Sequence, residues 1–159
     1  MKTLLLSLAL ILSSHMMAAD PTTQAPVVKS ATPSIRLQIE VPEAEVHPLG
    51  LKLQNLQTAI MTVLIKNNIS VQDDPANPLL LLRLKTIEAD TAYATFIQLA
   101  FYEDAILKRS NSDVMALTWS QASLITTTKE DFPAEVMKTI VGMTESFVAE
   151  YQKVLPTLK

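Results

Sequence analysis

The sequence predicts an α+β fold, a two-layer sandwich in which two amphipathic helices cover one face of a mainly antiparallel sheet of four to five strands. Three observations predict it. Two segments repeat apolar residues at helical spacing, other segments alternate or run apolar as strands do, and the elements follow the order β-α-β-β-β-β-α. Each helix needs an apolar surface to cover, and one face of a sheet can supply both.

The first strand is expected at residues 34–41, where the sequence SIRLQIEV alternates apolar with polar residues. A period of two is typical of a strand with one buried and one solvated face. Helical spacing of apolar residues then predicts a helix from residue 51 to about residue 66. Asn67-Asn68 suits the left-handed turn that closes a helix, and a short strand follows at residues 69–72.

Four consecutive leucines open the next strand, at residues 79–87. Apolar residues on both faces predict a central position in the sheet. Longer strands are expected at residues 93–107 and 114–125. Tight turns are expected before and between these three strands, at residues 73–78, 88–91 and 110–113.

The second helix is expected at residues 133–154. Pro133 stands where a first-turn proline belongs, and Pro156 ends the helix. At about 1.5 Å per residue the helix would be long enough to cross a small sheet. Its apolar face is marked by Val136, Ile140, Met143, Phe147, Tyr151 and Val154.

Residues 1–19 are typical of a secretory signal peptide. Lys2 supplies the positive start, residues 4–12 are apolar, and Ala19 is a plausible cleavage site. The apolar run is shorter than the roughly 20 residues that span a bilayer, so no stable membrane anchor is expected after cleavage. Residues 20–33, rich in Pro, Thr and Ala, are expected to form a flexible leader, and residues 34–156 a single α+β domain.

Charge and cysteine content narrow the class of protein. Without Lys2 the chain has 12 basic and 16 acidic residues, so the formal charge is 12 − 16 = −4. An acidic domain does not attract nucleic acid or anionic lipid. The chain has no cysteine, which indicates an unlipidated bacterial protein of the periplasm or the extracellular medium, without disulfides.

Residue content also excludes most catalytic chemistry. After signal cleavage His47 is the single histidine, which rules out the usual zinc sites and leaves a serine triad with a loop residue as its base. Gly50 and Gly142 are the two glycines, too few for a phosphate-binding loop. We therefore expect no cofactor, no metal, no catalytic residue and no enzymatic activity.

The carboxylates leave one alternative open, a carboxylate-dependent hydrolase that acts on envelope glycans. Such an enzyme needs two separated carboxyl groups in a cleft, and one of them must have a raised pKa. The adjacent pairs in this chain favour structural roles. Asp73-Asp74 suits a turn, and Glu130-Asp131 suits the start of a helix.

The uncovered face of the sheet is the main candidate site. If the helices cover Ile97, Leu99 and Phe101, then Phe96 and Tyr102 point to the other face. Such a patch predicts a protein partner or a homodimer, unless long side chains cover it or a strand is shifted by one residue. Arg83, Lys85, Phe96 and Tyr102 are the candidate binding residues; Arg36, Leu79, Leu81, Ala94, Gln98 and Ala100 are their expected neighbours.

Trp119 invites a carbohydrate-binding interpretation, but it stands in an apolar strand, where a core position is favoured. Core positions are also expected for Met61, Met115, Met137 and Met143.

The chain resembles small exported bacterial proteins of uncharacterised function. The segments that carry the resemblance are LQNLQTAIMTVLIKNNISV, LLLLRLKTI, YATFIQLAFYE, TWS and FVAEYQKVLP. More loosely, the layout is similar to envelope assembly accessories such as the lipopolysaccharide-transport lipoprotein and the amino-terminal domain of the Tol-Pal β-propeller protein. The chain lacks the acylation cysteine of the former and the propeller repeats of the latter, so the resemblance implies no site residue.

The leading hypothesis is an exported, non-enzymatic accessory protein that binds a protein partner through the open face of its sheet. The glycan hydrolase is the alternative, and a secreted inhibitor or effector would look the same in sequence as the leading hypothesis.

Overall fold

The computed structural model describes residues 33–41 and 50–155, all within one compact unit. The α+β class and the predicted order of elements are confirmed. The predicted signal peptide, residues 20–32 of the leader and His47 lie outside the described residues. The elements are β1 (Ser34–Glu40), α2 (Leu53–Lys66), β2 (Ser70–Val71), β3 (Leu79–Ala89), β4 (Ala92–Leu107), β5 (Ser112–Thr128) and α3 (Phe132–Val154).

The five strands form one sheet in the order β2-β1-β3-β4-β5. The long strands β3, β4 and β5 pair antiparallel, whereas β1 pairs parallel with both β2 and β3. The sheet is therefore mixed, although most of its ladder is antiparallel. The parallel pair β1–β2 follows from its connection, because two parallel neighbours need a crossover and α2 supplies it.

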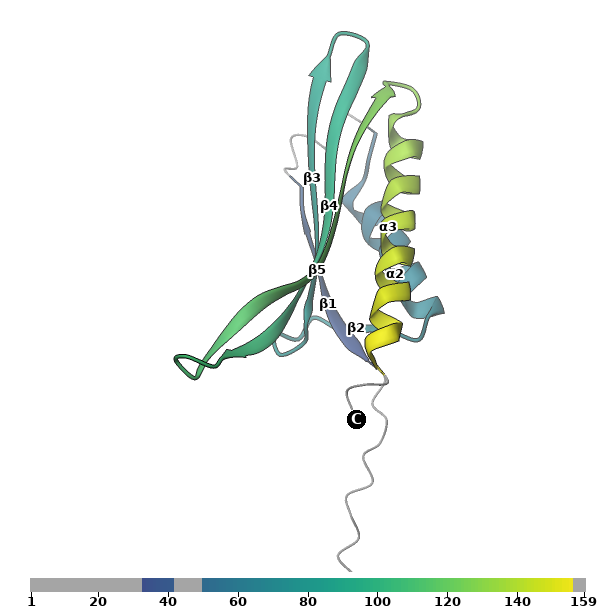
Figure 1. Cartoon of the computed structure of the whole chain (residues 1–159). Helices are drawn as coiled ribbons and strands as arrows, with labels where there is room; N and C mark the ends of the chain where they lie inside the picture. The colour runs from purple at the N-terminus through teal and green to yellow at the C-terminus, as the bar shows by residue number, and fades with distance from the viewer. Residues whose placement is uncertain (1–32, 42–49, 156–159) are drawn as a thin grey trace, which may run out of the picture. The chain divides into compact units, whose positions relative to one another are not determined.

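Both helices lie on the same face of the sheet, as the sequence predicts (Figure 1). Alternate residues of β3 and β4 point to these helices, and Ile97, Leu99 and Phe101 are at most 2% exposed. The helices contribute their apolar stripes to the same core. The fully buried apolar residues of the helices are Leu56, Ile60, Leu64, Phe132, Val136, Ile140 and Phe147.

Turn residues with a positive φ close the elements. Asn68 has φ 59° directly after α2, which confirms the predicted left-handed turn, and Asn111 has φ 51° between β4 and β5. Asparagine tolerates this region better than most residues. Pro133 lies in the first turn of α3 as predicted.

The far halves of β4 and β5 extend beyond the rest of the sheet. β4 pairs with β3 only as far as Tyr102, so residues 103–107 and 112–116 pair with each other alone. We call this two-stranded segment the arm; Figure 1 shows it leaving the sheet at the lower left. A β-bulge between Phe101 and Tyr102 marks its base. Neither helix in the described part of the chain is long and apolar enough to cross a membrane.

The arm corrects one of the predicted core positions. Met115 lies on the arm with 49% of its surface exposed, so its predicted core position is wrong. Trp119 lies at the base of the arm and is partly buried against the margin of the core. The sequence pattern missed the exposure of Met115 because a strand that extends beyond its neighbours keeps its apolar alternation.

Candidate functional site

The open face is the side of the sheet that the helices leave bare, and it contains the predicted binding residues. Lys85 on β3 lies directly opposite Phe96 on β4, and Leu79 lies opposite Tyr102. Arg83 lies between them, opposite Gln98. The register therefore brings Arg83, Lys85, Phe96 and Tyr102 onto one face, as the sequence analysis expects.

The centre of the open face is buried. Leu81 is 3% exposed and Ala100 is 0% exposed, although neither α2 nor α3 lies over this cross-strand pair. Arg83 and Tyr102 flank the pair at opposite corners and interact with each other. The expected apolar patch is thus interrupted in the middle, because Leu81 and Ala100 are buried there.

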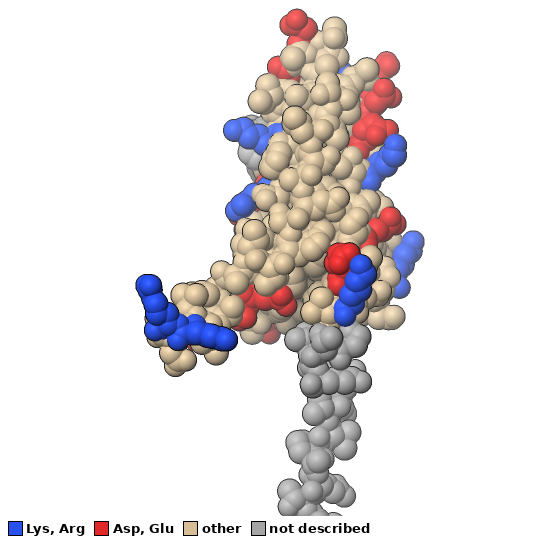
Figure 2. All heavy atoms as spheres, in the orientation of Figure 1, with Lys and Arg blue, Asp and Glu red and all other residues tan. Residues whose placement is uncertain are grey.

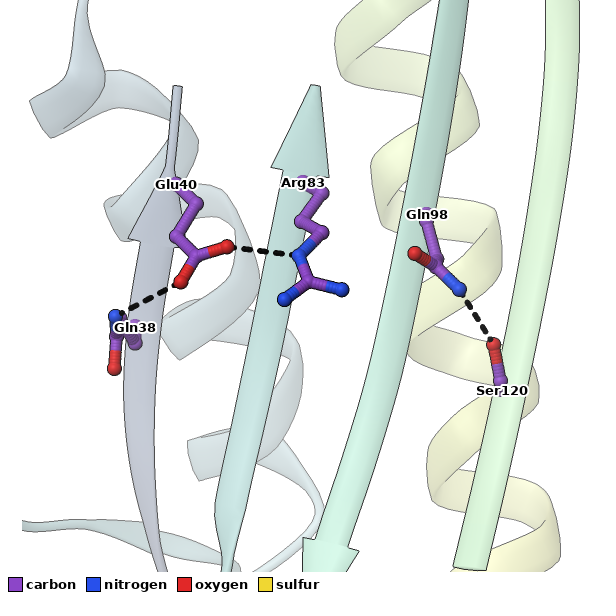
Figure 3. Close-up of polar contacts among 5 residues, drawn as sticks. All are labelled: Gln38, Glu40, Arg83, Gln98 and Ser120. Carbon is purple, nitrogen blue, oxygen red and sulfur yellow. Dashed lines mark hydrogen bonds and ion pairs between the residues drawn. The ribbon is translucent and has the colours of Figure 1, made fainter. Parts of the chain in front are cut away.

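A row of polar contacts crosses the same region (Figure 3). Arg83 Nε donates to Glu40 Oε2 at 2.8 Å, and Gln38 Nε2 donates to Glu40 Oε1 at 3.3 Å. Further along the sheet, Gln98 Nε2 donates to Ser120 Oγ at 3.2 Å. The hydrogen bond from Arg83 to Glu40 raises the pKa of the guanidinium above its ordinary value. These polar side chains form hydrogen bonds with one another, which gives this part of the face a structural role.

One end of the open face remains apolar and exposed. Ile87 is 63% exposed, Phe96 is 42% exposed, and Leu124 is 74% exposed. Phe96 and Leu124 are cross-strand partners, and Ile87 lies diagonally from Phe96 on β3. We call these three residues the apolar end. Alternation along β4 predicts that Phe96 lies on the open face. The position of Leu124 on this face could not be predicted, because the register of β5 against β4 cannot be derived from alternation alone.

A pocket of about 310 Å³ lies on the other side of the sheet, where the arm departs from the end of α3. Four aromatic residues from β4, β5 and α3 line it: Phe101, Trp119, Phe147 and Tyr151. The ring of Phe147 lies 4.9 Å from that of Phe101 and 5.3 Å from those of Trp119 and Tyr151, measured between centroids. Phe101 and Phe147 are buried, so they form the base of the pocket.

Two carboxylates complete the lining of the pocket, Glu103 from the arm and Glu150 from α3. Figure 2 shows acidic atoms where the arm joins the body. Glu150 Oε1 accepts a hydrogen bond from Lys153 Nζ at 2.7 Å. Burial of the Tyr151 hydroxyl raises its pKa above the ordinary value, and the negative charge of Glu103 raises it further.

The pocket bears directly on the hydrolase alternative, since Glu103 and Glu150 are two carboxylates that are far apart in sequence. A general acid in a glycosidase sits in surroundings that exclude water. The Glu150 side chain is instead 56% exposed and paired with Lys153. The pocket therefore supplies two carboxylates and an aromatic platform, but Glu150 lacks the dry environment that a general acid needs.

Sequence reasoning did not find this pocket. Glu150 lies three residues after Phe147 on α3, a spacing that places both on one side of the helix. Glu103 lies two residues after Phe101, on the same side of β4. Each spacing could be read from the sequence, but only the packing of α3 against β4 and β5 brings the two pairs together. In residues 33–41 and 50–155, no group of three or more metal-ligating side chains is present.

These features define the class: an α+β protein with a five-stranded mixed sheet, one helix-covered face, one open face and an aromatic pocket at the base of a projecting arm. No family model and no curated protein matches the chain. Two solved structures are similar in part, both at low identity. A minor lipoprotein from Acinetobacter baumannii is 11% identical, with 78% of this chain and 90% of that chain covered and a TM-score of 0.37. The rare lipoprotein B from Shewanella oneidensis is 10% identical, with 77% of this chain and 98% of that chain covered and a TM-score of 0.41.

Proposed function

We propose that this chain is an exported, non-enzymatic accessory protein of the bacterial envelope or the secreted fraction, and that it binds a partner protein through the open face of its sheet. The observation that carries the proposal is the apolar end. Ile87, Phe96 and Leu124 expose 63%, 42% and 74% of their surface side by side on a face that neither α2 nor α3 covers. Clustered apolar exposure of this kind is typical of an interaction site.

The surroundings of the apolar end fit a protein partner. Lys85 lies beside Phe96, and Gln98 lies two residues further along β4. An apolar centre with a polar rim is the usual anatomy of a protein–protein interface. The signal-peptide pattern of residues 1–19 supports a location outside the cytosol.

A photo-crosslinking amino acid placed at position 96 or 124 tests the proposal in the cells that express the protein. Position 65 is the matched control, because Ile65 is 59% exposed on α2 and lies off the open face. We expect a discrete protein adduct from positions 96 and 124 and none from position 65. An adduct with twice the mass of the chain would identify the partner as a second copy.

Competing variants show whether the adduct depends on the surface. Leu124→Ser should abolish the adduct formed at position 96, whereas Ile65→Ser should leave it unchanged, since only the first removes apolar area from the open face. Adducts of equal yield from positions 65, 96 and 124 would overturn the proposal. Tyr102 is not a suitable test position, because it interacts with Arg83.

A further inference from the structure

We propose that the pocket at the base of the arm binds a small organic cation, of the size and chemistry of a quaternary ammonium ion. The inference concerns a different surface from the proposed protein-binding face. The pocket is lined by the aromatic residues Phe101, Trp119, Phe147 and Tyr151 and by the carboxylates Glu103 and Glu150. Its chemistry combines aromatic rings with negative charge.

The aromatic walls of the pocket can attract a cation. Phe101 and Phe147 form a buried base, and the partly exposed rings of Trp119 and Tyr151 lie above it. The faces of aromatic rings carry negative electrostatic potential, so they attract a cation within about 6 Å of the ring centroid. Tryptophan is the most effective ring for this purpose, and quaternary ammonium ions are recognised by such aromatic cages.

The charged residues of the lining favour a cation over an anion or a neutral molecule. Glu103 and Glu150 are the charged residues of the lining within residues 33–41 and 50–155, and no lysine or arginine of these ranges lines the pocket. Lys153 pairs with Glu150, but this contact lies at the surface, where an ion pair contributes little and is readily exchanged. No ion-pair partner is found for Glu103 in the described ranges. An anion would be repelled here, and a neutral molecule would gain only apolar contact.

The β-bulge explains why the pocket is open. Phe101 pairs with Trp119, but Tyr102 pairs with Leu117, so Thr118 is the extra residue of β5. Its hydroxyl donates to the carbonyl oxygen of Phe101 at 3.4 Å. The shift places Ala116 opposite Glu103, whereas an unbroken register would place Leu117 there. A small residue thus stands beside the carboxylate, and the strand bends away from α3, as bulges beside binding sites commonly do.

The size of the pocket limits the ligand. Its volume of about 310 Å³ is at the lower end of the range of ligand pockets, which is roughly 300 to 1,000 Å³. This space suits a compact ion such as choline and excludes larger cofactors.

Trp119 provides a direct readout, because it is the single tryptophan of the chain. The full chain is titrated with choline at constant ionic strength while tryptophan fluorescence is recorded. The control ligand is dimethylbutanol, in which carbon replaces the ammonium nitrogen of choline. We expect a saturable fluorescence change with choline and at least a roughly tenfold weaker response to the neutral alcohol, because only the cation is attracted by the rings and the carboxylates.

Glu103→Gln tests the role of the carboxylate without changing its shape. We expect it to weaken choline binding about tenfold, whereas Asp104→Asn, an exposed change on the opposite face of the arm, should leave binding unchanged. Circular dichroism confirms that both variants are folded. Equal affinity for choline and the neutral alcohol, unchanged binding in Glu103→Gln, or no saturable change with choline would each overturn the inference.

Discussion

Phe147 connects the core with the pocket. Its side chain is fully buried, and its ring contacts those of Phe101, Trp119 and Tyr151 at centroid distances of 4.9, 5.3 and 5.3 Å. It thus joins α3 to both β4 and β5 at the place where the arm begins. Aromatic rings of this kind contribute buried area and, in tilted arrangements, a further favourable contact.

Phe147→Ala should lower the free energy of unfolding by about 3–5 kcal/mol, because it removes buried area and leaves a cavity that the rigid sheet cannot fill. Urea denaturation followed by circular dichroism measures the loss. Val154→Ala is the matched control, because Val154 is on the same helix but 52% exposed; its expected effect is below about 0.5 kcal/mol. Equal losses in the two variants would contradict the placement of Phe147 in the core.

The strand β5 lies at the edge of the sheet, where an exposed backbone can pair with another strand. Within the described residues it pairs with β4 on one side only, and no described strand pairs with its other edge. Residues 114–128 contain no charged residue and no proline. In the view of Figure 2 the surface over this strand is largely uncharged. Natural sheets usually protect such an edge with lysine, proline or bulges, and here the bulge at the base of the arm is the protection in place.

Ala122→Lys should slow aggregation on heating without lowering the midpoint of thermal unfolding, because a charge on the edge disfavours pairing with another strand. Ala122 is exposed and lies opposite Gln98, so a longer side chain can reach solvent. Light scattering during a thermal ramp measures the effect. Ala122→Ser is the uncharged control and should aggregate as the unmodified chain does. Equal aggregation of the lysine and serine variants would show that the edge is not the route of association.

At the scale of the whole folded unit, the pKa values that folding shifts clearly in the described residues are all shifted upward. The pKa values of Tyr151, Lys129 and Arg83 are raised: by burial at Tyr151, by the hydrogen bond to Glu88 at Lys129, and by the hydrogen bond to Glu40 at Arg83. A raised pKa in the folded state means that the protonated form is favoured by folding. The stabilisation is therefore complete below the unfolded-state pKa and is lost as pH rises through the folded-state pKa.

The free energy of unfolding should accordingly fall as the pH rises above about 10, near the ordinary pKa values of 10.0 for tyrosine and 10.5 for lysine. Tyr151→Phe should make this fall smaller, because phenylalanine cannot ionise. Urea denaturation at a series of pH values from about 8 to about 11 measures both curves. An identical alkaline slope in the two proteins would exclude Tyr151 as a contributor.

Much of the fold could be predicted from the sequence. The α+β class, the order of elements, the two helices on one face and the central position of the four leucines follow from periodicity, because a period of two or of 3.6 reports which side of an element is buried. The faces of β3 and β4 follow for the same reason, which placed Phe96 and Tyr102 on the open face. Periodicity does not report which residues lie opposite a strand or pack over it, so the burial of the Leu81–Ala100 pair was not predicted.

Local sequence thus determined the elements, their buried faces and the turns at asparagine positions, since these depend on residues that are near in the chain. Only the tertiary structure decided the rest. One bulge set the register of β5, which placed Leu124 on the open face and Ala116 beside Glu103. The packing of α3 against β4 and β5 then assembled the pocket from residues as distant as Phe101 and Tyr151. Such contacts depend on register and docking between separate elements, and no short-range pattern encodes either.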